Sequence, residues 1–317
     1  MKIIVTGGAG FLGSHLCDKL IEQGNQVICI DNLLTGNADN IAHLQNSPDF
    51  EFVEADALDS FPGELDFDAL YHLASPASPN KNNPRSYQAL PFETMQVNTF
   101  GTWNLCQEAL SRGAKFLFAS TSEIYGDPLK HPQKEDYLGN VSTTGPRSVY
   151  DESKRFGETI TSAFVRYHKL NGISVRIFNT YGPRMAQDGR AVIEFVNAAL
   201  TNNPFPVFGS GKQTRSFCYV SDLIDGIVAA LEKGKSGEVY NLGNPDELTI
   251  LELAEKIKQL TNSQSEAEFV SQLPEDDPIK RCPDITKARQ ELGWEPKVSL
   301  EEGLKKLIEY LKTVQTP

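Results

Sequence analysis

Residues 2–31 read KIIVTGGAGFLGSHLCDKLIEQGNQVICID and contain the pattern that decides the fold. An apolar run over residues 2–6 predicts a buried strand, and the glycines that follow open a helix extending to about Gly24. A second apolar run over residues 26–30 predicts another strand, which ends at Asp31. Strand, glycine-rich turn, helix, strand and acid, in this order, form the fingerprint of a dinucleotide-binding unit.

Each part of this motif has a physical task. Glycines permit a tight turn and let a pyrophosphate approach the backbone, while the helix N-terminus offers free N–H groups to the phosphates. Asp31 is placed to accept hydrogen bonds from a ribose diol, and its charge would repel a 2′-phosphate, so we expect NAD rather than NADP. The expected cofactor contacts in this unit are Gly7, Gly10, Phe11, Leu12, Gly13, Asp31 and Asn32.

Further segments continue the alternation of strands and helices. They predict strands over residues 51–55, 68–73, 115–118 and 173–178, and helices over about 92–112 and 150–171. This alternation predicts an α/β fold with a doubly wound parallel sheet, a Rossmann fold. We assign residues 1–179 to an NAD-binding domain, its sheet completed by parts of 215–245, and most of 180–317 to a smaller C-terminal α/β substrate-binding lobe. Beyond the third and fourth strands, the expected cofactor contacts are Asp56, Ala57, Leu73, Ala74 and Ser75.

Composition limits the partners and the compartment. The net charge of −12 argues against nucleic acid or an anionic membrane surface as a partner. No apolar run approaches the length of a membrane span, and the N-terminus does not resemble a signal peptide. The five cysteines are odd in number and form no metal-ligand spacing, which favours free thiols in a reducing compartment. We therefore expect a cytoplasmic protein without a bound metal.

Residues 119–126 read ASTSEIYG and follow the predicted strand over residues 115–118. Ligands of an open parallel sheet bind beyond the carboxyl ends of its strands, so Thr121, Ser122 and Glu123 mark a candidate site. An ordinary polar turn leaving the sheet would explain the same residues, because loops are generally polar. The rest of the chain has to decide between the two interpretations.

Tyr150 and Lys154 are four residues apart, which places both on one face of the predicted helix. An ammonium group beside a phenol favours the phenolate, so the tyrosine could act as a base well below its usual pKa. The same spacing also occurs by chance on helix surfaces. Together with the nucleotide motif and the strand end, it suggests an alcohol-oxidation unit of Thr121, Tyr150 and Lys154.

Four motifs together resemble the extended short-chain dehydrogenase/reductase family. They are the glycine motif at residues 6–13, His72-Leu-Ala74, Asn98-x-x-Gly101-Thr-x-Asn104 and Tyr150-x-x-x-Lys154. Within that family, the chain is most similar to the UDP-glucuronate decarboxylases, or UDP-xylose synthases. The stretches that carry this similarity are residues 72–79, 120–127, 150–155, 176–184, 209–215, 241–245 and 276–281.

This resemblance implies a carboxy-lyase that converts UDP-glucuronate to UDP-xylose through a 4-keto intermediate, with NAD recycled. Oxidation at C4 makes the uronic acid a β-keto acid, which loses carbon dioxide because the electrons settle into an enolate that hydrogen-bond donors stabilise. The implied catalytic residues are Thr121, Glu123, Tyr150, Lys154 and Arg215. The implied cofactor contacts include Tyr150 and Lys154 as well. The implied substrate contacts are Pro76, Tyr87, Ser122, Asn179, Arg184, Arg190, Arg215 and Arg281.

Glu123 separates the decarboxylases from their relatives by resemblance. The 4-epimerases usually carry small residues at this position, and the 4,6-dehydratases usually read Thr-Asp-Glu where this chain reads Thr121-Ser122-Glu123. Two roles for Glu123 stay open, proton handling or repulsion of the substrate carboxylate. A nucleotide-sugar 4-epimerase or 4,6-dehydratase is the alternative function, and a non-catalytic nucleotide-binding regulator is a remote one.

Several positions have plainer interpretations. Arg190 could be a solvated surface residue, and His72 is expected to be structural rather than an acid–base group. Asp276 and Asp277 could ligate a metal, but a salt bridge or a loop cap is the expected role.

The segment between Pro79 and Asn98 departs from the family pattern. It is longer, its portion Asn80–Ser86 has no counterpart, and residues such as Glu93 and Gln96 replace the usual lysines. Because this loop borders the substrate in relatives, the sugar or the nucleotide could differ. The helices that begin near residues 92 and 150 resemble the family's dimer-forming pair, which implies a homodimer, although their apolar residues could equally be core.

Overall fold

The computed structural model describes residues 1–59, 65–271, 278 and 280–315. Asp276 and Asp277, considered above as metal ligands, lie outside the described residues.

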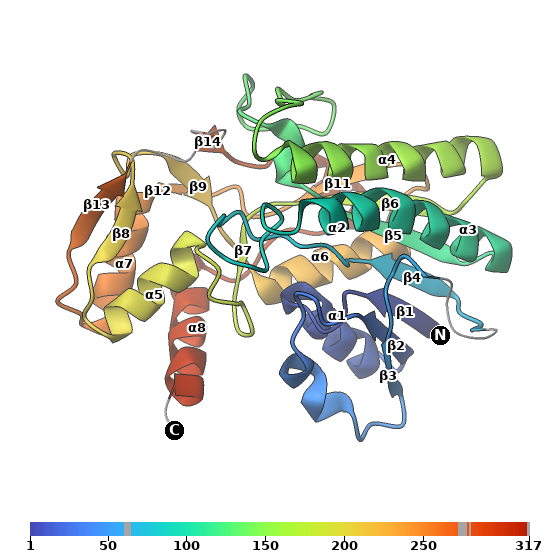
Figure 1. Ribbon diagram of the computed structural model, residues 1–317, viewed down its shortest axis with the longest axis horizontal. Helices are drawn as coiled ribbons and strands as arrows, with labels where there is room; N and C mark the ends of the chain where they lie inside the picture. The colour runs from blue at the N-terminus through green and yellow to red at the C-terminus, as the bar shows by residue number, and fades with distance from the viewer. Residues whose placement is uncertain (60–64, 272–277, 279, 316–317) are drawn as a thin grey trace.

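Seven parallel strands form the central sheet in the order β3-β2-β1-β4-β5-β6-β11 (Figure 1). Their bounds are β1 Lys2–Thr6, β2 Gln26–Asp31, β3 Phe50–Glu54, β4 Ala69–His72, β5 Lys115–Thr121, β6 Gly172–Ile177 and β11 Val239–Leu242. The order reverses between β1 and β4, and doubly wound sheets bind ligands at that switch point. The predicted Rossmann sheet is confirmed, and a strand from the region 215–245 completes it at the β6 edge.

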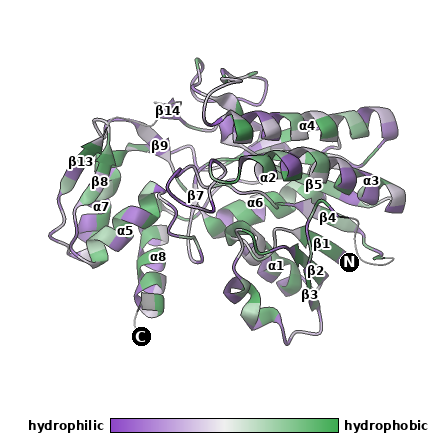
Figure 2. Ribbon diagram, in the orientation of Figure 1, coloured by the Kyte–Doolittle hydropathy of each residue, from purple (hydrophilic) through white to green (hydrophobic). Residues whose placement is uncertain are grey.

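Helices cover both faces of the sheet (Figure 1). One face carries α1 Phe11–Glu22 and α6 Val220–Lys233, and the other carries α2 Pro91–Gln96, α3 Thr102–Arg112 and α4 Ser148–His168. Strand β1 shows why a continuous apolar run is needed, since Ile3 and Val5 enter one core cluster and Ile4 enters the other. The helices carry both hydrophobic and hydrophilic residues (Figure 2). Among the described residues, no helix has the length and apolar character required to cross a membrane.

Two element boundaries differ from the sequence-based expectation in ways that matter for the site. Strand β5 continues to Thr121, because Ser120 and Thr121 still pair with β6, at Arg176 and Ile177. The polar residues thus begin inside the strand. The helix predicted over residues 92–112 consists of α2, a π-helical turn over Val97–Gly101, and α3.

The C-terminal half adds small sheets and three helices, which lie together at the left of Figure 1. Its short strands pair as β7 with β10, β8 with β13, and β12 with β9 and β14. The bounds are β7 Thr180–Tyr181, β8 Phe205–Phe208, β9 Thr214–Ser216, β10 Cys218–Tyr219, β12 Glu247–Thr249, β13 Ala267–Ser271, β14 Lys280–Arg281, α5 Ala191–Leu200, α7 Ile250–Thr261 and α8 Leu300–Gln315. Three single turns complete the elements: 3-10 turns over Ala38–Leu44 and Ser122–Tyr125, and a π-helical turn over Ala288–Leu292.

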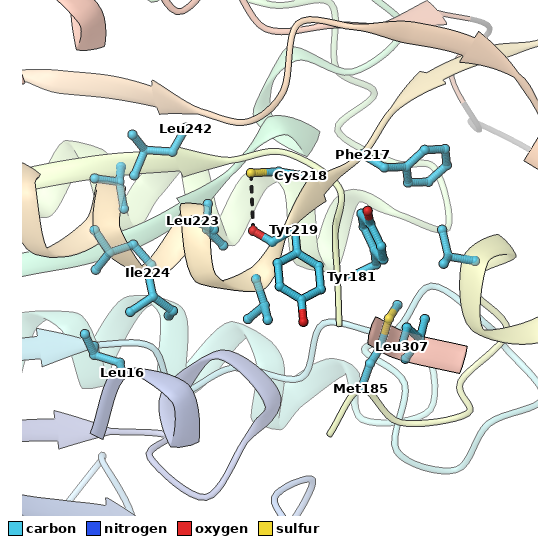
Figure 3. Close-up of a cluster of buried hydrophobic side chains, with 14 of the residues drawn as sticks. Leu16, Tyr181, Met185, Phe217, Cys218, Tyr219, Leu223, Ile224, Leu242 and Leu307 are labelled. Carbon is cyan, nitrogen blue, oxygen red and sulfur yellow. Dashed lines mark hydrogen bonds between the residues drawn. The ribbon is translucent and has the colours of Figure 1, made fainter. Parts of the chain in front are cut away.

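One hydrophobic cluster connects this half to the central sheet. Leu16 from α1, Leu223 from α6 and Leu242 from β11 belong to the same buried cluster as Tyr181 and Leu307 (Figure 3). The C-terminal strands and helix α8 are therefore packed against the nucleotide-binding half, and the ends of β5 and β6 lie close to the residues of β9 and β14. The division at residue 179 stays a prediction.

Candidate active site

The glycine loop after β1 packs against the end of β4. A Cβ atom placed on Gly7, whose φ is +74°, would lie 2.6 Å from the Ala74 nitrogen, and one on Gly13 would lie 2.0 Å from the Gly7 oxygen. Gly10 is the N-cap of α1, and Phe11, Leu12 and Gly13 form its first turn. No side chain fits at Gly7 or Gly13, because the chain's own backbone fills the space, so these glycines are what allow the turn to pack against the start of α1 and the end of β4.

Replacing Gly13 by alanine is expected to destabilise the protein and weaken NAD binding, because the new methyl group would force the Gly7 peptide aside. The expected loss of unfolding free energy is about 1–3 kcal/mol, the usual cost of overpacking. Urea unfolding and an NAD titration measure the two effects. Gly101→Ala is the matched control, since its Cβ would meet no atom closer than 3.5 Å. Equal behaviour of the two variants would contradict the expectation.

Asp31 ends β2 with its carboxylate oriented by the backbone. It accepts hydrogen bonds from the N–H groups of Ala9, at 3.0 Å, and Leu33, at 2.9 Å. Burial raises the pKa of this carboxyl group, and the two N–H bonds oppose that effect. The Asn32 amide donates to Asp56 at 2.8 Å, which joins the ends of β2 and β3. The acid of the dinucleotide motif is thus held beside the glycine loop.

The remaining predicted cofactor contacts lie at the same edge of the sheet. Ala57 is buried three residues after β3, and Leu73, Ala74 and Ser75 follow β4 directly. Among the predicted substrate contacts, Pro76 is buried in the same segment and accepts a hydrogen bond at its carbonyl from the Ser75 hydroxyl at 3.0 Å. The carboxyl ends of β1 to β4 therefore carry the whole predicted cofactor set up to Ser75.

The predicted oxidation unit is assembled at the end of β5. Thr121 is the last residue of that strand, Tyr150 lies in the first turn of α4, and their hydroxyl groups are hydrogen bonded. Lys154 follows one turn later, with its Nζ 5.9 Å from the centre of the Tyr150 ring. The same Nζ donates to the Ala119 carbonyl at 2.8 Å. All three side chains are buried.

The expected lowering of the Tyr150 pKa is wrong for this structure. Burial raises the pKa of the phenol, while the hydrogen bond from Thr121 lowers it. Burial also lowers the pKa of Lys154, to about 7, so the amine is near the balance between its charged and neutral forms at neutral pH. The chain by itself therefore keeps Tyr150 protonated.

Tyr87 covers Tyr150. Its ring stacks on Tyr150 with centroids 4.8 Å apart and planes 11° apart, and it is 1% exposed. It comes from the segment that departs from the family pattern, whose turns are closed by Asn80, Asn83 and Ser86. This segment thus places a buried aromatic ring over Tyr150 and shields it from water.

Glu123 lies between two arginines. Its carboxylate is paired with Arg147 on one oxygen and Arg281 on the other. Burial opposes ionisation of Glu123, but Arg147, Arg281 and Arg215 together outweigh it and hold the pKa of the carboxyl group below its usual range. Three guanidinium groups thus gather at Glu123, and guanidinium groups recognise carboxylate and phosphate oxygens. Of the predicted substrate contacts, Arg215 and Arg281 are brought together with Glu123.

Sequence reasoning missed Arg147. It immediately precedes α4, three residues before Tyr150, so it lies about one helical turn from that tyrosine. That spacing was the available signal, but Arg147 sits in a polar loop where an arginine is ordinarily solvated. Its side chain is instead only 8% exposed.

Four other predicted substrate contacts have partners or positions other than the Glu123 carboxylate. Arg184 is paired with Asp18 of α1 at 2.7 Å, and Arg190 with Asp188 at 2.8 Å. Arg190 is nevertheless near the site, since its charge lowers the pKa of Tyr150. Asn179 lies between β6 and β7, and Ser122 is buried in the turn after β5.

His72 has the structural role expected for it. Its Nδ1 is 2.8 Å from the Thr6 hydroxyl and its Nε2 is 3.3 Å from the Val97 carbonyl oxygen. Burial and the charge of Lys154 lower its pKa to about 3, so the imidazole is neutral. His72 thus connects β4 to Thr6 of β1 and to Val97 of the π-helical turn.

This fold and site define a dinucleotide-dependent enzyme of the short-chain dehydrogenase/reductase type. The chain belongs to the NAD dependent epimerase/dehydratase family, whose model matches residues 3–243.

Its relatives include a plant enzyme and an animal enzyme. The chain is 50% identical to UDP-glucuronic acid decarboxylase 1 of Arabidopsis thaliana over 312 residues, covering 97% of this chain and 69% of that protein. It is 47% identical to UDP-glucuronic acid decarboxylase 1 of Xenopus tropicalis, covering 98% of this chain and 72% of that protein. A solved structure of UDP-glucuronic acid 4-epimerase from Bacillus cereus, in complex with UDP-glucuronic acid and NAD, has a TM-score of 0.88 and 31% identity, with 99% of this chain and 100% of that chain covered.

Proposed function

We propose that the protein is an NAD-dependent carboxy-lyase that converts UDP-glucuronate to UDP-xylose. The observation that carries the proposal is the ionised Glu123, held between Arg147 and Arg281 directly after the strand that ends in Thr121. This arrangement puts charges that recognise an anion beside a hydroxyl-oxidising unit. The relatives at about half identity support the same reaction.

The chemistry of the residues follows from their environments. A bound NAD, held by the glycine loop and Asp31, would supply a reversible hydride acceptor for C4 of the sugar. Tyr150 takes the proton of the 4-hydroxyl, and Thr121, hydrogen bonded to it, orients the phenol oxygen. The positive charge of Lys154 favours the phenolate once the amine is protonated. Thr121 and Tyr150 then donate to the enolate oxygen that forms as the carboxylate is lost.

The arginine cluster suits both negative parts of the substrate. Arg147, Arg215 and Arg281 gather at Glu123, and their guanidinium groups can bind the oxygens of a uronate or diphosphate group. Because Glu123 is ionised, it repels the substrate carboxylate and accepts protons more readily than it donates them. We propose that this repulsion favours the departure of carbon dioxide.

A 4-epimerase acting on the same substrate is the second candidate, because the Bacillus cereus structure contains UDP-glucuronic acid and NAD in a very similar fold. Mass spectrometry of the product separates the two. Purified protein incubated with UDP-glucuronate is expected to release carbon dioxide and a nucleotide pentose without net consumption of NAD. A product of unchanged mass, which keeps the carboxylate, would establish the epimerase.

We also propose a homodimer formed through α3 and α4. The π-helical turn that leads into α3 exposes Phe100 (68%), α4 exposes Tyr167 (71%), and a groove of about 660 Å³ lies beside α4. Phe100→Glu is expected to give a monomer by light scattering, because a charge would be buried at the contact. Leu129→Glu, at a still more exposed apolar residue in a loop, should remain dimeric. A dimer that survives Phe100→Glu would contradict this interface.

Two further proposals concern context. The five cysteines are all buried free thiols, which supports a reducing compartment such as the cytoplasm. Strands β9 and β14 carry Arg215 and Arg281, which supports the C-terminal half as the main source of nucleotide-sugar contacts.

A further inference from the structure

Three side chains from distant parts of the chain lie close together next to the strand that carries Arg281. They are His131 from the loop after the 3-10 turn, Glu247 at the start of β12, and Cys282 directly after β14. One potential ligand atom from each lies within 4.8 Å of the other two. The sequence shows no metal-binding motif here, because the three residues are far apart in the chain. His131 and Glu247 are separated by 116 residues, and Glu247 and Cys282 by 35.

Backbone hydrogen bonds hold the cluster in place. Gln133, two residues after His131, donates its N–H to the Cys282 carbonyl at 2.9 Å and accepts the Cys282 N–H at its side-chain oxygen at 2.9 Å. The Thr214 hydroxyl donates to one Glu247 oxygen at 2.8 Å, and the other oxygen is 2.7 Å from His131 Nε2. The ligand-bearing segments are therefore fixed before any ion binds.

The chemistry of the three groups matches a borderline-soft divalent ion. An imidazole nitrogen, a thiolate sulfur and a carboxylate oxygen are the ligands of zinc, and three protein ligands leave one position for water. Glu247 and a Cys282 thiolate would together balance the two positive charges of the ion. Cys282 is buried, whereas His131 and Glu247 are partly exposed, so an ion could enter from solvent.

We propose that His131, Glu247 and Cys282 form a binding site for a zinc-like divalent transition-metal ion. The ion takes the place of the hydrogen bond between His131 and Glu247, the neutral imidazole keeps its one proton on the nitrogen that does not bind the ion, and the Cys282 thiol proton passes to solvent as one bond forms from each ligand atom. The carboxylates of Glu247, Asp246 and Asp284 lie around Cys282, and their negative field attracts a cation.

The site would act on the arginine cluster through the backbone. Cys282 directly follows Arg281 in the chain. Glu247 in β12 lies opposite Ser216 in the neighbouring strand β9, and Ser216 directly follows Arg215. A bound ion would clamp both arginine-bearing strands to the loop at His131. The consequence is a more stable native state, because an ion that binds only the folded chain raises its stability.

Cobalt(II) titration of the full chain tests the site, because thiolate ligation gives a charge-transfer absorption band. One cobalt ion per chain is expected, with that band, and zinc is expected to displace it. Cys282→Ser is expected to abolish the band, and His131→Gln and Glu247→Gln to weaken binding about 100-fold or more, since ligand loss exceeds the 10–100-fold cost of losing a supporting residue. His43→Gln is the matched control, because His43 and Asp18 form a similar pair at 2.7 Å outside the cluster.

A second measurement on the unaltered protein covers the case in which a variant fails to fold. Zinc titration by calorimetry, repeated in buffers of different ionisation enthalpy, is expected to show release of at least one proton per ion, together with a higher Tm. Cobalt binding without the band, a band that persists in Cys282→Ser, or zinc binding without proton release would each overturn the proposal.

Discussion

Tyr150→Phe is expected to lower kcat by about 10³-fold, within the range typical for loss of a positioned acid–base group. The substitution removes only the phenol oxygen that takes the proton of the 4-hydroxyl. The ring remains buried and stacked on Tyr87, so the fold and the nucleotide site should persist. Steady-state kinetics with UDP-glucuronate measure the loss, and titrations of NAD and of the nucleotide sugar verify that binding is retained.

Tyr87→Phe is the matched control for this prediction. It removes the hydroxyl of the stacked partner, whose oxygen is buried and has no hydrogen-bond partner in the described residues. Because Tyr87 does not bond to Thr121, the change should affect KM for the sugar more than kcat. A Tyr150→Phe enzyme with kcat within about tenfold of the original would show that another group takes the proton.

Glu123→Gln is expected to abolish measurable decarboxylation and to destabilise the protein without substrate. The amide keeps the shape of the side chain but leaves Arg147 and Arg281 buried without their counter-charge, at a cost of about 3 kcal/mol. UDP-glucuronate should restore much of this stability, because its carboxylate or diphosphate replaces the missing negative charge. The rise in Tm on adding the nucleotide sugar should therefore be larger in the variant than in the original protein.

Glu158→Gln is the control for that experiment. Glu158 forms a similarly buried pair with Arg176, at 2.8 Å, so its loss should also lower Tm. Glu158 and Arg176 bond to Ser120 and Tyr125 and not to Glu123, so the nucleotide sugar should not restore the lost stability. If both variants respond equally to UDP-glucuronate, the arginines around Glu123 do not bind the substrate anion.

The pH dependence of turnover follows from Lys154. Burial lowers the pKa of its ammonium to about 7, so the charged form that favours a Tyr150 phenolate is lost as pH rises through neutrality. Deprotonation of Tyr150 instead becomes easier as pH rises, and burial raises the pKa of its phenol. Turnover therefore needs a protonated Lys154 and a deprotonated Tyr150 at the same pH, and these two requirements oppose each other.

Much of the fold and the outline of the site could be predicted from local patterns. The run from Lys2 to Asp31 specifies strand, turn, helix and strand through periodicity and glycine positions, which are properties of neighbouring residues. The pairing of Thr121 with Tyr150 was also expected, because both belong to motifs of a family that the chain resembles. Arg147 was not, because nothing local to it distinguishes a buried ion pair from a solvated arginine.

The sequence by itself determined the Rossmann sheet, the dinucleotide loop and the family, since each depends on short-range spacing. Only the tertiary structure decided which arginines surround Glu123, that Tyr87 covers Tyr150, and that His131, Glu247 and Cys282 meet. The physical reason is that charges and rings act over a few ångströms in space, and these partners are brought together by packing between segments far apart in the chain. Burial then sets the charge state of each group, and burial belongs to the folded molecule as a whole.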